Sequence, residues 1–290
     1  MTLSSLIESD ILNWIAPRTK HTKNVLARLK KYESTDKQKA LNDEEVWTLL
    51  LVYGYIVCGK MSLLDLAKVL TGTKQESVTK AWLEMKPMPP RKGVSGKSER
   101  NSQIDLLVGD ITKRGKTESG VKYKAKPRED DGWACFVEAK WLSDIAVKTT
   151  HDWERNQLAR VIETALTFQG DGQWPSRVYV TLLTPAIFKT PRESSASRLY
   201  AYKWWEYVNE DGNINLDAIR TDIDRSSVAA RTDTKGWTYP DDLDERLGHL
   251  SMNWVTYEDL LSAMPKSDYY SALCNFVAQE TELLQKHEVA

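Results

Sequence analysis

A glutamate and a lysine two residues apart interrupt an otherwise apolar run at residues 133–141, Trp-Ala-Cys-Phe-Val-Glu-Ala-Lys-Trp. A short apolar run of this kind predicts a buried β-strand. Residues i and i+2 of a strand share one face, so Glu138 and Lys140 are expected to project together. Burying a carboxylate and an ammonium beside a sheet is costly unless the charges are paired or metal-bound. The run therefore predicts a site with a chemical role.

The spacing alone is weak evidence, because an acid followed two residues later by lysine occurs three times in the chain. Residues 84–86 are expected at the end of a helix, and residues 233–235 in a polar loop. Only residues 138–140 lie in an apolar strand-like run. The alternative interpretation is a solvated pair on an edge strand, and surface pairs of that kind contribute little.

A second acid strengthens the prediction. Residues 104–111 form another short apolar run, with Asp105 near its start. The two runs can pair as an antiparallel hairpin with a long loop, which would let Asp105 and Glu138 face one pocket. Two carboxylates suit Mg²⁺, which keeps several waters and accepts phosphate oxygens. The amine of Lys140 could orient or deprotonate a metal-bound water.

Asp105 followed by Glu138-Ala139-Lys140 resembles the core of the PD-(D/E)xK nuclease superfamily, which has the restriction-endonuclease-like fold. Ile104 stands where the family usually has proline. The resemblance covers residues 95–185. It implies an α/β fold with a mixed sheet flanked by helices, and a Mg²⁺-dependent deoxyribonuclease in which Mn²⁺ can replace Mg²⁺.

The resemblance also implies roles for individual residues. Asp105 and Glu138 would bind the metal, together with the backbone carbonyl of Ala139, and Lys140 would act on the attacking water. Glu99 stands where many family members carry a further acid on a preceding helix. Residues 151–166 resemble the helix after the second catalytic strand, which often places a polar residue at the site. The candidates there are Gln157, Arg155 and Arg160.

The distribution of charge provides independent support. The whole chain has a net charge of -1, but residues 86–128 hold twelve Lys or Arg and four Asp or Glu, a local excess of +8. Basic clusters of this kind supply most of the affinity for polyanions. A solvated basic loop without a partner is the alternative. The expected DNA-binding residues are Arg155 after the second strand and, between the two strands, Lys113, Arg114, Lys116, Lys122, Lys124, Lys126 and Arg128.

Two domains are expected, a helical one over residues 1–86 and a nuclease-like one over residues 87–290. Within the first, residues 62–85 resemble a helix-turn-helix with Gly72 in the turn, but an ordinary helical hairpin that packs a bundle is the favoured interpretation. If the motif is real, its DNA-facing residues would be Lys74, Gln75, Ser77, Thr79 and Lys80.

The composition of the chain indicates its cellular compartment. Three well-separated cysteines and four scattered histidines indicate neither a disulfide framework nor a zinc site, so a reducing cytoplasm is expected. No signal-peptide layout or membrane-spanning run is present, and no membrane partner is expected. By resemblance, the setting is restriction, phage defence or mobile-element processing, with DNA, a second copy or a partner protein bound. A catalytically inactive DNA-binding module and an RNA-directed enzyme are the alternatives.

Overall fold

The computed structural model describes residues 2–7, 19–34, 43–59, 62–78, 80–91, 103–126, 132–145, 155–189, 191, 198–232 and 234–288. Its elements, in chain order, are α1 (Leu3–Ile7), α3 (Thr19–Ser34), α5 (Glu44–Ile56), α6 (Ser62–Thr71), β1 (Ala81–Met85), β2 (Ile104–Gly109), β3 (Ile111–Lys113), β4 (Val121–Tyr123), β5 (Trp133–Ala139), α7 (Gln157–Leu166), β6 (Arg177–Thr184), η2 (Ala186–Phe188), α8 (Leu199–Tyr207), α9 (Leu216–Asp224), α10 (Leu243–Leu247), β7 (Leu250–Thr256), α11 (Tyr257–Ala263) and α12 (Asp268–Glu288).

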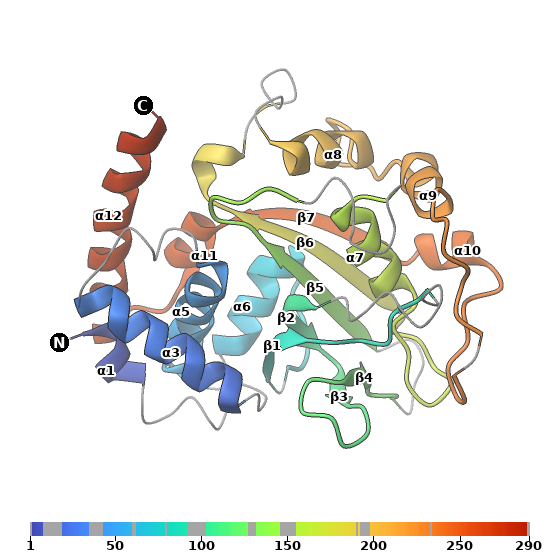
Figure 1. Ribbon diagram of the computed structural model, residues 1–290, viewed down its shortest axis with the longest axis horizontal. Coiled ribbons are helices and arrows are strands. Elements are labelled where there is room, and N and C mark those ends of the chain that lie inside the picture. Colours follow the sequence, from blue (N-terminus) through green and yellow to red (C-terminus); the bar gives the residue numbers. More distant parts are fainter. Residues whose placement is uncertain are drawn as a thin grey trace.

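A mixed five-stranded sheet in the order β1-β2-β5-β6-β7 organises the fold. β1 pairs with β2, and β2 with β5, in antiparallel orientation, whereas β5, β6 and β7 run parallel. The antiparallel pairing of β2 with β5 confirms the pairing predicted from the sequence, and α7 connects β5 to the parallel strand β6. The structure is therefore an α/β fold with helices on both faces of the sheet (Figure 1).

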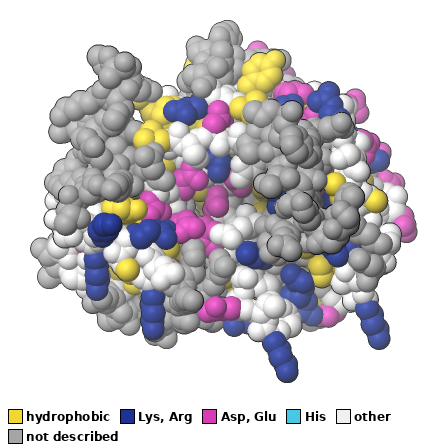
Figure 2. All heavy atoms as spheres, viewed as in Figure 1, with side chains coloured by type: hydrophobic (Ala, Val, Ile, Leu, Met, Phe, Trp, Pro, Cys, Tyr) yellow, Lys and Arg dark blue, Asp and Glu magenta, His cyan; other side chains and the backbone are white. Residues whose placement is uncertain are grey.

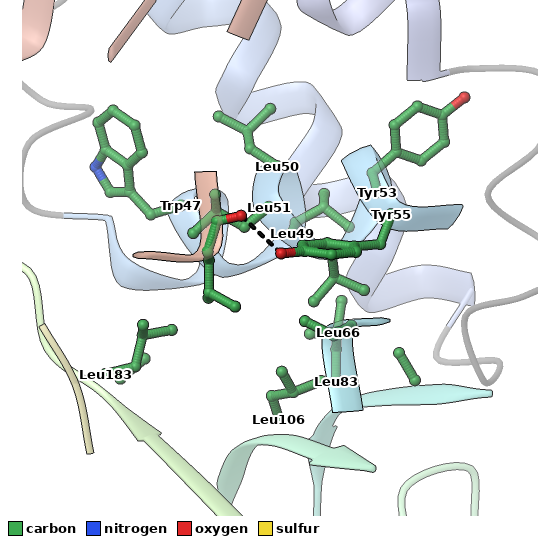
Figure 3. Close-up of a cluster of buried hydrophobic side chains, with 14 of the residues drawn as sticks. Trp47, Leu49, Leu50, Leu51, Tyr53, Tyr55, Leu66, Leu83, Leu106 and Leu183 are labelled. Carbon is green, nitrogen blue, oxygen red and sulfur yellow. Dashed lines mark hydrogen bonds between the residues drawn. The ribbon is translucent and has the colours of Figure 1, made fainter. Parts of the chain in front are cut away.

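The N-terminal helices cover one face of the sheet. α5 is apolar almost all round, and its residues from Val46 to Ile56 are buried. Figure 3 shows its side chains lying against Leu83, Leu106 and Leu183 of three different strands, with Leu66 of α6 beside them. The Tyr55 hydroxyl donates to the carbonyl of Leu260, at 2.7 Å, which ties α5 to α11. This face of the sheet is therefore closed by a continuous apolar core.

α7 covers the other face, where it packs against β5 and β6. The alternation along β5 explains this division, because Phe136 lies in the core beneath α7 and Val137 lies in the core beneath α5. α8, α9 and α10 extend the α7 side. None of the helices in the described ranges is both long enough and apolar enough to cross a lipid bilayer.

The helix expected over residues 75–85 is wrong, and with it the helix-turn-helix at residues 62–85. α6 ends at Thr71, Gly72 takes a left-handed φ of 69°, and residues 81–85 form β1. Every residue of β1 is buried, and β2 supplies its hydrogen-bonding partner. A short apolar run fits a helix or a strand by periodicity alone, so only the pairing with β2 decides.

The described residues that the helix-turn-helix would have turned toward DNA do not lie on a recognition helix. Gln75 is buried and donates to Thr71 Oγ1 at 3.1 Å and to the Tyr179 hydroxyl at 3.3 Å. Thr79 lies outside the described residues. The domain boundary expected after residue 86 falls between β1 and β2, which are paired strands of one sheet.

Gly109, at the end of β2, tests how tightly the sheet is built. Its φ is +131°, and an added Cβ would lie 2.6 Å from the backbone oxygen of Trp133. We expect Gly109→Ala to lower the free energy of unfolding by about 2–4 kcal/mol, because backbone strain adds to a clash with an immobile strand. Urea denaturation followed by circular dichroism measures this change.

The matched control is Gly115→Ala. Gly115 also has a positive φ, of 64°, but nothing lies within 4 Å of an added Cβ. This substitution should cost about 1 kcal/mol, from backbone strain alone. Equal destabilisation at the two glycines would contradict the close approach of β2 to β5.

Candidate functional site

Asp105 on β2 and Glu138 on β5 are cross-strand neighbours. Leu106 pairs with Val137 in the antiparallel register, so the next pair along is Asp105 with Glu138. Directly opposed residues of antiparallel strands share a face of the sheet. The two carboxylates therefore project side by side, from the face that α7 covers.

A third acid, Glu84 on β1, continues this row. Leu83 pairs with Leu106, which places Glu84 opposite Asp105 on the outer strand. Glu84 is buried, has a positive φ of 55° and accepts a hydrogen bond from the Gln103 side chain. Sequence reasoning missed it because its segment was assigned to a helix. The signal was present, because an acid inside an apolar run is the same feature that marked Glu138.

The environment of Asp105 disfavours its charged form. Burial and the nearby carboxylates of Glu138 and Glu84 hold the pKa of Asp105 well above its usual range. Two influences oppose this rise: the charge of Lys140, and the backbone N–H of Ala139, which donates to Oδ2 of Asp105 at 2.7 Å. An additional positive charge near Asp105 would therefore stabilise its ionised form.

Lys140 supplies the positive charge in the described part of the cluster. Its Nζ lies 2.8 Å from Oε1 of Glu138 and 3.5 Å from Oε2 of Glu44, and the residue is 5% exposed. Burial lowers the pKa of an ammonium, but the carboxylates of Glu138, Asp105 and Glu44 outweigh burial and raise the pKa of Lys140 above its usual value. The side chain is therefore a charged hydrogen-bond donor at neutral pH, which favours orienting a water over deprotonating one.

Glu44, the first residue of α5, was not expected at this site. It reaches the segment after β5 from the opposite side of the sheet and accepts hydrogen bonds from the backbone N–H of Trp141, at 3.2 Å, and from the Ser143 hydroxyl. Its neighbour Asp43 caps α5, because the Asp43 side chain accepts a hydrogen bond from the N–H of Val46. No sequence pattern links position 44 to position 140.

Gln157 begins α7 and donates its side-chain amide to Oε1 of Glu138. Asn156 caps this helix by accepting from the N–H of Ala159. Asn156 also donates to the hydroxyl of Tyr207, at 3.0 Å, and to Asp222, at 2.9 Å. The N-terminus of α7 is thus held by α8 and α9, which fixes Gln157 against the acidic row.

Arg155 does not lie at the acidic cluster, although it was expected to contact DNA. It is fully buried and forms an ion pair with Glu163 inside α7. Glu163 also binds Arg91 at 2.7 Å and the Tyr239 hydroxyl at 2.7 Å. A guanidinium used in this way holds the core together and does not reach a ligand at the surface.

The basic residues between β2 and β5 lie largely on a hairpin formed by β3 and β4. Lys122 pairs with Asp171 at 2.6 Å, and Lys126 with Asp110 at 2.8 Å. Arg114 donates to the backbone oxygen of Lys86. The exposed members of the set are Lys113, Lys116 and Lys124. Glu99 and Arg128 lie outside the described residues.

The oxygen atoms of this cluster could bind a hard divalent cation, but only with few protein ligands. Within the described ranges, no three side chains of His, Cys, Asp or Glu are arranged to hold a metal ion. Mg²⁺ needs only one or two carboxylates, because it keeps waters in its shell. Oε1 of Glu138 and Oδ2 of Asp105 are engaged, but Oε2 and Oδ1 form no hydrogen bond or ion pair with any described residue. One oxygen from each acid, with the Ala139 carbonyl, could therefore meet a cation.

Figure 2 shows that Asp and Glu side chains gather near the middle of one face of the molecule. A scan against protein-family models, a search of curated proteins and a search of solved structures each found no match to this chain.

The raised pKa of Asp105 predicts how stability depends on pH. Because the folded-state pKa lies above the unfolded one, ionisation of this carboxyl opposes folding, and the penalty grows as the pH rises above about 4. Asp105→Asn, whose amide oxygen can still accept from Ala139, should match the wild type below that pH and melt at a higher temperature at neutral pH. Thermal unfolding in EDTA across this range measures the difference.

Asp211→Asn is the control for this measurement, because Asp211 lies at an exposed turn. Its melting temperature should follow the wild type throughout. An Asp105→Asn protein that is less stable than the wild type at neutral pH would show that Lys140 and the Ala139 N–H fully compensate the charge.

Proposed function

We propose that this protein is a Mg²⁺-dependent DNA nuclease, built on a restriction-endonuclease-like version of the α/β fold. The observation that carries the proposal is the juxtaposition of Asp105 and Glu138 on neighbouring strands, with the ammonium of Lys140 2.8 Å from Glu138. Two carboxylates can hold the cation of metal-assisted phosphodiester hydrolysis, and a fixed ammonium can orient the attacking water.

Asp105 and Glu138 would hold the cation, together with the backbone carbonyl of Ala139, and Mn²⁺ would substitute for Mg²⁺. The bound cation supplies Lewis-acid activation of water and neutralises phosphate charge. Because the added charge favours the ionised carboxyl, cation binding and ionisation of Asp105 support each other.

The chain's own residues would orient the reaction. Lys140, charged at neutral pH and already paired with Glu138 and Glu44, would donate its remaining N–H to the attacking water, and its positive charge would stabilise the negative charge that develops on the phosphate. Gln157 holds Oε1 of Glu138 and thereby fixes the orientation of that carboxylate. In-line attack on phosphorus would leave a 5′-phosphate and a 3′-hydroxyl.

The β3–β4 hairpin would bring the substrate backbone to these groups. Its exposed lysines lie on the segment that joins β2 to β5, so the polyanion contact and the acidic row belong to adjacent parts of the chain. By the resemblance to restriction-like nucleases, the setting would be restriction, phage defence or mobile-element processing, as a dimer or with a partner protein.

Cleavage of supercoiled and linear DNA tests the proposal. The wild type should nick or linearise a circle with Mg²⁺ and not with EDTA. Asp105→Ala and Lys140→Ala should each lower the cleavage rate by about 100-fold or more, because each removes a group used in the transition state. Both variants should retain DNA binding in a gel-shift assay.

Lys235→Ala is the matched control, because Lys235 follows an acid at the same spacing but lies exposed in a loop. It should cut like the wild type. A protein that binds DNA equally well in EDTA and never nicks it would be a binding module. Cleavage of a matched RNA in place of DNA would establish an RNA-directed enzyme.

Replacement of Lys113, Lys116 and Lys124 together by Ala tests the hairpin. For duplex DNA, each phosphate that the protein no longer neutralises should reduce the slope of log affinity against log salt concentration by about 0.9, so the triple variant should show a slope smaller by up to about 2.7. Fluorescence anisotropy at several salt concentrations measures the slope. A double Ala variant of Lys122 and Lys126, which are paired with acids, should change it less. An unchanged slope in the triple variant would exclude the hairpin as the DNA-binding element.

A further inference from the structure

Glu44 connects the N-terminal helices to the lysine of the candidate site, and it uses its two oxygens differently. Oε1 accepts from the backbone N–H of Trp141 and from the Ser143 hydroxyl, whereas Oε2 lies 3.5 Å from Nζ of Lys140. One oxygen therefore anchors the segment that follows β5, and the other contacts the ammonium.

The position of Glu44 is itself fixed from α3. Its neighbour Asp43 caps α5 and accepts from Arg28, at 2.7 and 3.1 Å, and from the Tyr32 hydroxyl at 2.8 Å. Both donors lie on α3. The first turn of α5 is thus held from one side by α3 and from the other by the segment after β5.

Aromatic stacking reinforces the same junction. Trp47, one turn after Glu44, stacks on Trp141 with ring centroids 3.9 Å apart and an interplanar angle of 9°. Trp141 directly follows Lys140, and both indoles are buried. The stack keeps the start of α5 beside the end of β5, so Glu44 cannot move away from Lys140 without disturbing the core.

A lysine side chain is long and loses up to about 2 kcal/mol of rotamer entropy when it is held in one place. Glu138 alone would leave the ammonium free to turn about a single ion pair. A second carboxylate, that of Glu44, restricts Nζ to positions within reach of both acids. Glu44 already accepts from three donors, which makes it a poor candidate for binding a cation as well.

We propose that Glu44 is a positioning residue, through which the N-terminal helices hold the ammonium of Lys140 in its working place. This inference rests on the proposed nuclease function, and it makes the N-terminal helices part of the site. In this role the carboxylate of Glu44 contacts the ammonium of Lys140 and does not bind the metal ion.

Glu44→Gln is the sharpest test, because the remaining oxygen can still accept from Trp141 and Ser143, while the amide that replaces Oε2 repels the ammonium. We expect the cleavage rate constant to fall about 10-fold, the magnitude expected when one well-placed hydrogen bond is removed, with little change in KM for DNA. The Mg²⁺ concentration for half-maximal cleavage should not change. In a Lys140→Ala background the same substitution should have no further effect.

The matched control is Glu45→Gln, which removes the same charge from the same turn of α5. Glu45 contacts Arg28 and makes no ion pair with Lys140 in the described part of the chain. It should cleave within about 2-fold of the wild type, since surface pairs of this kind contribute little. Thermal unfolding of all variants identifies any that do not fold.

A second measurement does not depend on cleavage. The rate of acylation of the Lys140 amine by an amine-reactive ester, read by mass spectrometry without DNA or metal, should rise at least about 3-fold in Glu44→Gln and stay unchanged in Glu45→Gln, because removing one of its two carboxylate partners frees the amine. Acylation of the exposed Lys235 provides the internal reference.

The outcomes separate this inference from the proposed function. A wild type that never cleaves nucleic acid, with labelling that changes as expected, would remove the nuclease and keep the positioning role. Unchanged labelling, additive effects of Glu44→Gln and Lys140→Ala on cleavage, or a Mg²⁺ requirement raised about 10-fold or more by Glu44→Gln would each overturn the positioning role.

Discussion

The burial of one ammonium among carboxylates at the end of β5 is the interaction on which the candidate site depends. Lys140 and Glu138 are both almost fully buried and 2.8 Å apart. Such a pair is tolerated only where further hydrogen bonds satisfy the remaining donors and acceptors. Gln157 and Glu44 provide those bonds from opposite sides of the sheet. The negative charge still exceeds the positive, and burial together with the neighbouring carboxylates raises the pKa of Asp105 well above its usual value.

The need to satisfy this buried ion pair explains why helices from both faces of the sheet, α5 and α7, begin beside the end of β5. α7 is fixed at its N-terminus by contacts to α8 and α9, and it places Gln157 on the acidic row. α5 is fixed at its N-terminus by α3 and by the stack of Trp47 on Trp141, and it places Glu44 on Lys140. A sheet covered by helices on both faces can bring helix N-termini to the same strand end, and backbone N–H groups at those termini favour negative charge.

Part of this arrangement could be predicted from the sequence, because it follows from local periodicity. The polar pair inside the run at residues 133–141 indicated a shared face, and the short run containing Asp105 indicated a second strand. Glu84 was missed because five apolar-rich residues fit a helix as well as a strand, and only the pairing with β2 distinguishes them. Arg155 was misplaced because a helix pattern does not show which arginine will find a buried acid such as Glu163.

The sequence by itself determined the strands that carry Asp105 and Glu138, the position of Lys140 directly after the second strand, and the clustering of basic residues between β2 and β5. These depend on residues close together along the chain, where alternation acts. Only the tertiary structure decided that Glu84 and Glu44 join the same cluster, that Lys140 lies between two carboxylates, and that Arg155 does not take part. The contact between Glu44 and Lys140 joins positions 96 residues apart, and its geometry exists only once the helices have packed on the sheet.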